Sequence, residues 1–344
     1  MEIHQDIIST GMGDFSKKKF NALVNVRATA LDGLREALKY RGYSEVTTST
    51  LVNIAGSCEN PHASFKLNYY SKEAHLSQSA QIQLEKLVIG LNRRVFTVNN
   101  SFREENYDDP EAKGRRLSEF TLVEPERPYG GLQPEQALDR IIEEQTEVIK
   151  YVTQKVVEIC GRDITKLGGD AEYLRKTVLT RFERITYDEA IERLNREGGD
   201  FKFGGDLGVL AERALLKQFG DIPTFVTHYP TSIKFFNMKR MPDGQRVYSV
   251  DLLTPRLGET SGGAIREENG DVIKQQLRES KIGDYLLKMG QDPVIPFSDY
   301  FNVFEQEPPL LRGGYGIGFE RFVGFLLQSN DILDTVRYVT PLPR

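Results

Sequence analysis

The sequence has few cysteines and no long apolar run, and these absences exclude several classes of protein. Its two cysteines, Cys58 and Cys160, cannot build a disulfide framework or a cysteine-rich zinc site. No stretch approaches the roughly 18 apolar residues of a membrane helix. The first residues, MEIHQDIISTGMGDF, carry acids where a signal peptide has a basic region and then an apolar one. We therefore expect no redox chemistry and no membrane segment, and we expect the protein in the cytoplasm.

The sequence also lacks a net positive charge. The formal net charge of -5 supplies no global basic field for nucleic acid, which leaves only a local basic face as a means of binding it. The sequence has no internal repeat, low-complexity tract or Pro/Ser-rich linker that would mark a second domain. Its 344 residues, 39% of them hydrophobic, suffice for a large core. These features predict one compact unit.

Hydrophobic spacing predicts three helices and several strands. Apolar residues three to four positions apart indicate helices over 16–41 and 134–160, the first followed by Gly42 as a C-cap. A third helix begins at Thr186, where TYDE fits a capping box closed by Glu189. The strand-like stretches cluster instead of alternating strictly with helices, which favours an α+β fold with an antiparallel sheet. They are RVFTVN (94–99), EFTLVE (119–124), TFVTHYP (224–230) and RVYSVDLL (246–253).

The segment SFREENYDDPEAKGRRLSEFTLVEPE, residues 101–126, sets three arginines around two strand-like stretches. An antiparallel hairpin would place Arg103, Arg115 and Arg116 on one side of a sheet. Guanidinium groups are always charged and fork onto phosphate oxygens, so the arrangement suits a polyphosphate. Taken alone, the segment also fits a solvated hairpin with surface ion pairs.

The segment YSVDLLTPRLGETSGGAIREE, residues 248–268, holds two carboxylates. Asp251 and Glu259 lie on either side of an apolar turn, and two glycines allow close backbone approach just before Arg266. Carboxylates beside bound phosphates are typical ligands of Mg²⁺. A plain strand and turn with ordinary surface charges is the alternative interpretation.

The segment GGYGIGFERFVGFLL, residues 313–327, is a glycine-rich stretch followed by an apolar helix. Glu320 and Arg321 fall in the first turn of that helix, so Arg321 could face a ligand from a buried element. Plain helix packing explains a lone stretch of this kind nearly as well.

Together and in this order, the three segments resemble the motifs of class II aminoacyl-tRNA synthetases, in the asparaginyl and aspartyl branch. GYSEVTTSTL is similar to motif 1, FREEN through RRLSEFTLVEPE to motif 2, and GGYGIGFER to motif 3. QSAQIQLE, HYPTSIKFFNM, VDLLTPRLGE and GGAIRE resemble the substrate-pocket stretches of the asparaginyl branch. The resemblance implies a short extension over 1–19 and a catalytic domain over 20–344, with a six- to seven-stranded antiparallel sheet flanked by helices. It also implies a homodimer.

The resemblance implies an ATP site on the matching positions. Arg103 would contact the α-phosphate, and Arg321 would contact the γ-phosphate and stack over adenine, which makes both catalytic. Phe120 would lie under the other face of adenine, and Glu105 would accept a hydrogen bond from its amine. The outer phosphates would be reached by Arg115 or Arg116.

The same resemblance implies an amino-acid site and a metal site. Glu59 would receive the α-ammonium group of the amino acid, while Gln81 and Arg266 would clamp its carboxylate or side-chain carbonyl. Asp251 and Glu259 would hold Mg²⁺. Attack of a carboxylate on the α-phosphorus needs no general base, because the nucleophile is already an anion, and arginines with Mg²⁺ stabilise the charge that develops.

Some positions depart from the family pattern. The family reads the anticodon with an N-terminal β-barrel, and the stretch before the helix at 16 is too short for one. Ser49 stands where motif 1 has a proline, which bears on the dimer. Leu84, beside Glu85, stands where aspartyl enzymes place a lysine, which favours an asparaginyl-like pocket.

Three hypotheses on function follow. Stand-alone domains of this kind include the archaeal-type asparagine synthetase related to asparaginyl-tRNA synthetase. The first hypothesis is therefore a tRNA-independent ligase that uses ATP and Mg²⁺ to adenylate an acidic amino acid, aspartate, and passes the acyl group to ammonia or a small amine. Its partners would be the amino acid and the amine, and we expect no tRNA. The second is aminoacylation of a tRNA or a carrier. The third, an inactive regulatory paralogue, conflicts with the complete set Arg103, Phe120, Asp251, Glu259 and Arg321.

Overall fold

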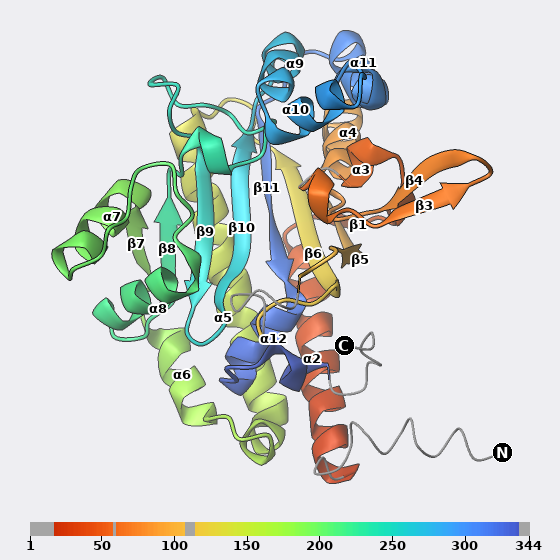
Figure 1. Ribbon diagram of the computed structural model, residues 1–344. Helices are drawn as coiled ribbons and strands as arrows, with labels where there is room; N and C mark the ends of the chain where they lie inside the picture. The colour runs from red at the N-terminus through yellow and green to blue at the C-terminus, as the bar shows by residue number, and fades with distance from the viewer. Residues whose placement is uncertain (1–16, 58–59, 107–113, 337–344) are drawn as a thin grey trace.

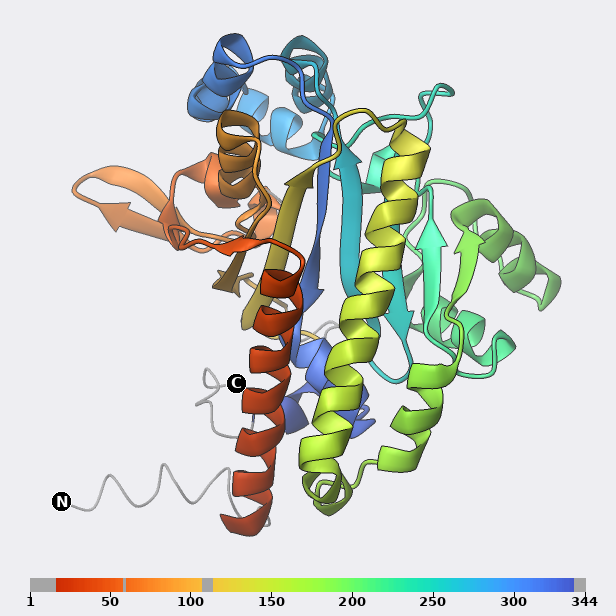
Figure 2. The ribbon, with the colours of Figure 1, turned by 180° about the vertical axis from the view of Figure 1, so that it is seen from behind.

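The central feature of the protein is a large sheet with long helices against one face (Figures 1 and 2). The computed structural model describes residues 17–57, 60–106 and 114–336. The helices of this part are α2 (Lys17–Tyr40), α3 (Ile54–Ser57), α4 (Gln81–Leu91), α5 (Pro134–Lys166), α6 (Ala171–Leu179), α7 (Tyr187–Arg196), α8 (Gly208–Gln218), α9 (Gly270–Arg278), α10 (Lys281–Lys288), α11 (Ser298–Gln306) and α12 (Phe319–Leu327). The strands are β1 (Ser44–Glu45), β2 (Leu51–Val52), β3 (Lys66–Tyr69), β4 (Lys72–Leu76), β5 (Val95–Phe102), β6 (Glu119–Pro128), β7 (Glu183–Thr186), β8 (Thr224–Thr227), β9 (Ser249–Thr254), β10 (Gly258–Arg266) and β11 (Arg312–Gly318).

The large sheet is mostly antiparallel. Within the described residues it has eight strands in the order β1-β5-β6-β11-β10-β9-β8-β7. Only the two outermost pairs, β1 with β5 and β7 with β8, are parallel. A second sheet in the order β2-β4-β3 carries a hairpin that projects from the body (Figure 1).

Helices α2 and α5 run side by side across the back of the sheet (Figure 2). Leu23 and Leu34 of α2 lie in one core with Val148 and Val152 of α5. The three- to four-residue spacing of such side chains makes each helix apolar on one face. Each fully buried Val or Leu contributes roughly 1.5–3 kcal/mol to folding, so this layer holds the sheet rigid from behind.

Side-chain alternation leaves the opposite face of the sheet polar. Val123 and Val250 point into the core, whereas their neighbours Glu124 and Asp251 line a cavity on the other face. Successive residues of a strand point to opposite faces. The strands therefore point carboxylates into the cavity from one face of the sheet, while their other face packs on the apolar layer of helices.

The expected α+β class with an antiparallel sheet and flanking helices is confirmed. Helix α2 ends at a left-handed Gly42 (φ 81°), and α7 has the capping box of Thr186 and Glu189. Helix α5 continues to Lys166 after a bend at Cys160. Within the described residues the large sheet has eight strands, more than the six to seven that the resemblance implied, because the short strands β1 and β7 pair along its two edges. In the described residues, no helix is long and apolar enough to cross a membrane.

Candidate active site

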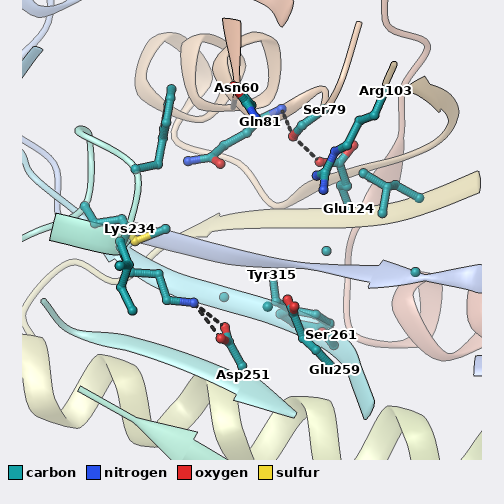
Figure 3. Close-up of a pocket in the computed structure, with 18 of the residues that line it drawn as sticks. Asn60, Ser79, Gln81, Arg103, Glu124, Lys234, Asp251, Glu259, Ser261 and Tyr315 are labelled. Atoms are coloured by element: carbon teal, nitrogen blue, oxygen red, sulfur yellow. Dashed lines mark hydrogen bonds and ion pairs between the residues drawn. The ribbon is translucent and has the colours of Figure 1, made fainter. Parts of the chain in front are cut away.

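A cavity of about 810 Å³ opens on the polar face of the sheet (Figure 3). It lies between the central strands, the start of α4 and the helices α9 and α10. The residues expected in the site converge on it from segments far apart in sequence, with one exception. Glu59, expected to bind the α-ammonium group, lies outside the described residues. Those that line the cavity are Gln81, Arg103, Glu105, Arg115, Arg116, Phe120, Asp251, Glu259, Arg266 and Arg321.

The β5–β6 hairpin places Arg103 beside Phe120. Strands β5 and β6 pair in register from Val95 to Phe102, and the backbone N–H of Arg103 continues the pairing by donating to Ser118 (2.9 Å). The Arg103 guanidinium carbon lies 5.3 Å from the centre of the Phe120 ring, a cation–π distance. A flat aromatic face and a fixed positive charge therefore stand next to each other, as a nucleotide base and its phosphate require.

Each of the two arginines that follow the hairpin loop is paired with a carboxylate. Arg115 donates to Glu212 of α8 (2.8 Å) and to the carbonyl of Leu257 (3.1 Å). Arg116 donates to Glu105 (3.3 Å). Burial raises the pKa of Glu212 to about 7, although Arg115 opposes the rise. Ligand phosphates would have to displace Glu212 from Arg115.

Asp251 and Glu259 converge over Gly262. A Cβ atom at that glycine would lie 3.1 Å from Glu259 Oε1 and 3.2 Å from Asp251 Oδ1, so the two carboxylates flank one small space. Lys234 Nζ bonds both oxygens of Asp251, at 2.7 and 2.5 Å (Figure 3). Burial raises the pKa of Asp251 to about 6, and Lys234 opposes this. Burial also acts to raise the pKa of Glu259, but Arg321 and other nearby cations outweigh it and lower the value.

These two carboxylates fit a magnesium ion only as a partial site. No cluster of three or more His, Cys, Asp or Glu in the described ranges could hold a metal. Mg²⁺ commonly takes one or two carboxylates and completes its shell with phosphate oxygens and water. Asp251 and Glu259 therefore suit a metal that arrives with phosphates and not one held by protein alone.

Gln81 and Arg266 line the same cavity, Gln81 from the first turn of α4 and Arg266 from the last residue of β10. Arg266 donates from Nε and Nη2 to Glu126 of β6 (3.2 and 3.1 Å). Burial raises the pKa of Glu126 to about 7, and the Arg266 charge opposes it. The Gln81 side chain reaches into the cavity from the first turn of α4 (Figure 3). The part of the cavity around Gln81 and Arg266 offers hydrogen-bond donors and acceptors to a small polar group of a ligand.

Sequence reasoning missed four of the charged residues around the cavity. Lys234 and Glu126 stand inside stretches that were compared with the family, but neither was given a role. Glu124 lies in the same stretch as Glu126 and was also given no role, and Glu212 lies in none of these stretches. Glu124 accepts from the Ser79 hydroxyl at 2.5 Å (Figure 3) and from the Ala80 N–H at 2.9 Å. A search for unexplained charges in otherwise apolar strands would have found Glu124 and Glu126.

Known proteins are similar to this chain over nearly its whole length. A family model described as tRNA synthetases class II (D, K and N) matches residues 8–342. The asparagine–tRNA ligase of Pyrococcus abyssi is 34% identical over 95% of this chain and 69% of its own length. That of Lactobacillus johnsonii is 32% identical over 96% of this chain and 70% of its own length.

Solved structures give the same result. Asparaginyl-tRNA synthetase from Pyrococcus horikoshii, complexed with asparaginyl-adenylate, matches with a TM-score of 0.80 and 32% identity, covering 93% of this chain and 68% of that one. The enzyme from Entamoeba histolytica, in complex with asparaginyl-adenylate, matches with a TM-score of 0.78 and 25% identity, covering 100% and 72% of the two chains.

Proposed function

The chain belongs to the class II tRNA synthetases of the D, K and N group, and on that premise we propose that it adenylates asparagine and transfers the asparaginyl group to a tRNA. It would be an ATP-dependent ligase that releases pyrophosphate and then AMP. The observation that carries the proposal is that one cavity joins the Arg103–Phe120 pair and Arg321 to the polar pair Gln81 and Arg266.

Two expectations drawn from the sequence need correction. The expectation that tRNA is not a partner is wrong, because the relatives that match 95% of the chain are asparagine–tRNA ligases. That expectation was drawn from the net charge of -5 and from the length of the stretch before the first helix. Transfer of an aspartyl group to ammonia finds no support among these relatives, so the second hypothesis, aminoacylation, replaces the first.

The arrangement of charges supports adenylation of the α-carboxylate. Asparagine has only this free carboxylate, whose oxygen would bond to the α-phosphorus of ATP as the bond to pyrophosphate breaks. Arg103 would contact the α-phosphate, and the Phe120 ring beside it would lie under the adenine. Arg321, which donates to the Glu259 carbonyl (2.5 Å), would bind the far phosphates. Fixed cations stabilise the developing charge without reorganising during the reaction.

Magnesium is part of the proposal. Asp251 and Glu259 would hold the ion against the phosphates, where it neutralises their charge. Lys234 would remain close enough to share the carboxylate of Asp251. The roles of Glu59 and Glu105, the homodimer and the cytoplasmic location stay predictions.

The test is pyrophosphate–ATP exchange with each of the twenty amino acids, followed by charging of total tRNA and by product analysis with ammonium in place of tRNA. We expect exchange with asparagine and asparagine attached to tRNA. Exchange with aspartate, together with free asparagine made from ammonium and no charged tRNA, would overturn the proposal in favour of an amide-forming ligase. Absence of exchange with every amino acid would overturn adenylation itself.

A further inference from the structure

A buried ion pair joins helix α2 to the first turn of α12, two helices that lie side by side (Figure 1). Arg27 Nη2 of α2 donates to Glu320 Oε1 of α12 at 2.9 Å, and the two side chains are 12% and 4% exposed. Arg27 Nη1 donates to the Thr335 carbonyl (2.9 Å), and the guanidinium carbon lies 4.8 Å from the centre of the Phe319 ring. An ion pair, a carbonyl and an aromatic ring therefore fix the Arg27 guanidinium.

The second oxygen of Glu320 binds the backbone of strand β6. Strands β6 and β11 pair as far as Leu122 and Gly318, where β11 ends. One residue farther along β6, the Thr121 N–H donates to Glu320 Oε2 (2.8 Å). The carboxylate thus accepts the hydrogen bond that a longer β11 would have accepted. The Thr121 N–H belongs to the peptide group that follows Phe120, so this bond fixes the backbone that carries the Phe120 ring.

Glu320 is also tied to Arg321, the next residue of α12. Arg321 lines the cavity together with Phe120, and its Nη1 donates to the Glu259 carbonyl (2.5 Å). In the proposed function Phe120 lies under the adenine of ATP and Arg321 binds the far phosphates. One ATP molecule can use both side chains only if their separation matches the distance between its base and its phosphates. The Glu320 carboxylate connects the backbone segments that carry them.

Stabilisation of the helix dipole is the simpler explanation for an acid in the first turn of a helix. It does not account for the contacts of Glu320, because both carboxylate oxygens bind groups outside α12 and the side chain is almost fully buried. A buried carboxylate is costly unless it is paired and hydrogen-bonded. Arg27 supplies that pairing from the layer of helices behind the sheet.

We infer that the Arg27–Glu320 pair is a positioning element of the ATP site: it fixes the separation of Phe120 and Arg321, so that one ATP molecule can contact both. This inference rests on the proposed function, since it takes the cavity as the site of ATP. Arg27 acts through Glu320, and Glu320 acts through the two side chains that it holds in place.

The test separates ATP binding from stability. Arg27→Met leaves Glu320 buried without its cation, and we expect it to lower both the midpoint of thermal unfolding and the affinity for ATP. Adding Glu320→Met removes the unpaired charge, and apolar side chains that replace a buried ion pair often cost no stability. The double variant should therefore regain the unfolding midpoint. Its Kd for ATP with Mg²⁺, measured by calorimetry, should stay roughly tenfold or more above the wild-type value, because small displacements of binding groups have large effects.

Two further variants and a kinetic measurement sharpen the test. Arg27→Lys keeps a cation for Glu320 and should retain most of the affinity for ATP. The matched control is Arg35→Met, which removes another arginine of α2, paired with Glu45 (2.8 Å), and should leave the Kd unchanged. In pyrophosphate exchange, the KM for ATP should rise in the double variant while the KM for the amino acid stays the same.

Return of ATP affinity together with stability in the double variant would overturn the inference, because the pair would then only stabilise the fold. An equal rise of both KM values would overturn it as well. If Arg27→Met does not fold, the same measurements on the double variant decide. If the wild type binds ATP and the double variant binds it equally well, only this inference fails. If the wild type binds no ATP, the proposed function fails, and this inference with it.

Discussion

At the residue scale, Arg103 and Arg321 both line the cavity, one from the β5–β6 hairpin and one from α12, and we propose that both bind phosphate. We expect Arg103→Ala and Arg321→Ala each to lower pyrophosphate exchange by roughly 10²–10³-fold, as is typical when one fixed donor to a developing charge is removed. The midpoint of thermal unfolding should change little. Arg196→Ala on the exposed face of α7 is the control, and near-normal exchange in either site variant would refute the assignment of that arginine.

A second residue-scale prediction concerns Lys234 and Asp251, whose side chains are only 16% and 8% exposed. Lys234→Met would leave Asp251 buried without its partner, and such a loss destabilises by about 3–5 kcal/mol. Adding Asp251→Asn should recover most of the free energy of unfolding. Urea unfolding at pH 8 measures both changes.

The Lys234→Met deficit should depend on pH. Burial raises the pKa of Asp251 from its usual value to about 6 even with Lys234 present, and removal of Lys234 raises it further. The folded state then holds the proton more tightly than the unfolded chain, so stability is retained at low pH and lost as pH rises through the folded pKa. The deficit should therefore shrink at pH 5. A deficit of equal size at pH 5 and pH 8 would mean that lost packing, not charge, is its cause.

At the element scale, strand β11 approaches β6 too closely for a side chain at Gly314. A Cβ atom there would collide with the Pro125 carbonyl and the Glu126 carboxylate, whereas at Gly316 the nearest atom is Glu124 Cγ at 3.6 Å. Gly314→Ala should lower the free energy of unfolding by about 1–3 kcal/mol, as overpacking does. Gly316→Ala, in the same strand, is the matched control and should unfold near the wild-type denaturant concentration. Equal stability of the two variants would contradict the close approach.

At the scale of the whole molecule, the open question that bears on function is assembly. Strand β1 forms one edge of the large sheet directly after α2, in the segment that resembles motif 1. If this edge is the family's dimer interface, analytical ultracentrifugation should give a molecular mass of twice the 39.1 kDa of one chain. A single species at 39.1 kDa would show that Ser49 and its surroundings do not sustain the dimer.

The fold class could be predicted from the sequence, and most of the expected site residues line one cavity, because the signals for both are local in the chain. Helices α2 and α7 could be predicted because spacing and capping residues are contiguous in the chain. Three of the site residues could be singled out because each lies in a short contiguous motif, and the motifs follow one another in the family's order. They are Arg103, Asp251 and Arg321. The error about tRNA arose differently, because it was drawn from the net charge and from the length of the stretch before the first helix, and neither describes the site.

The pairing of charges across the fold could not be predicted from the sequence. Glu85 and Arg312 are 227 positions apart, and Arg115 and Glu212 are 97 apart. Such pairs depend on strand register and on how loops return to the sheet, and no local pattern encodes either. The motifs could therefore predict one site for ATP and an amino acid, but they could not predict the buried partners that the charged side chains meet in the folded chain.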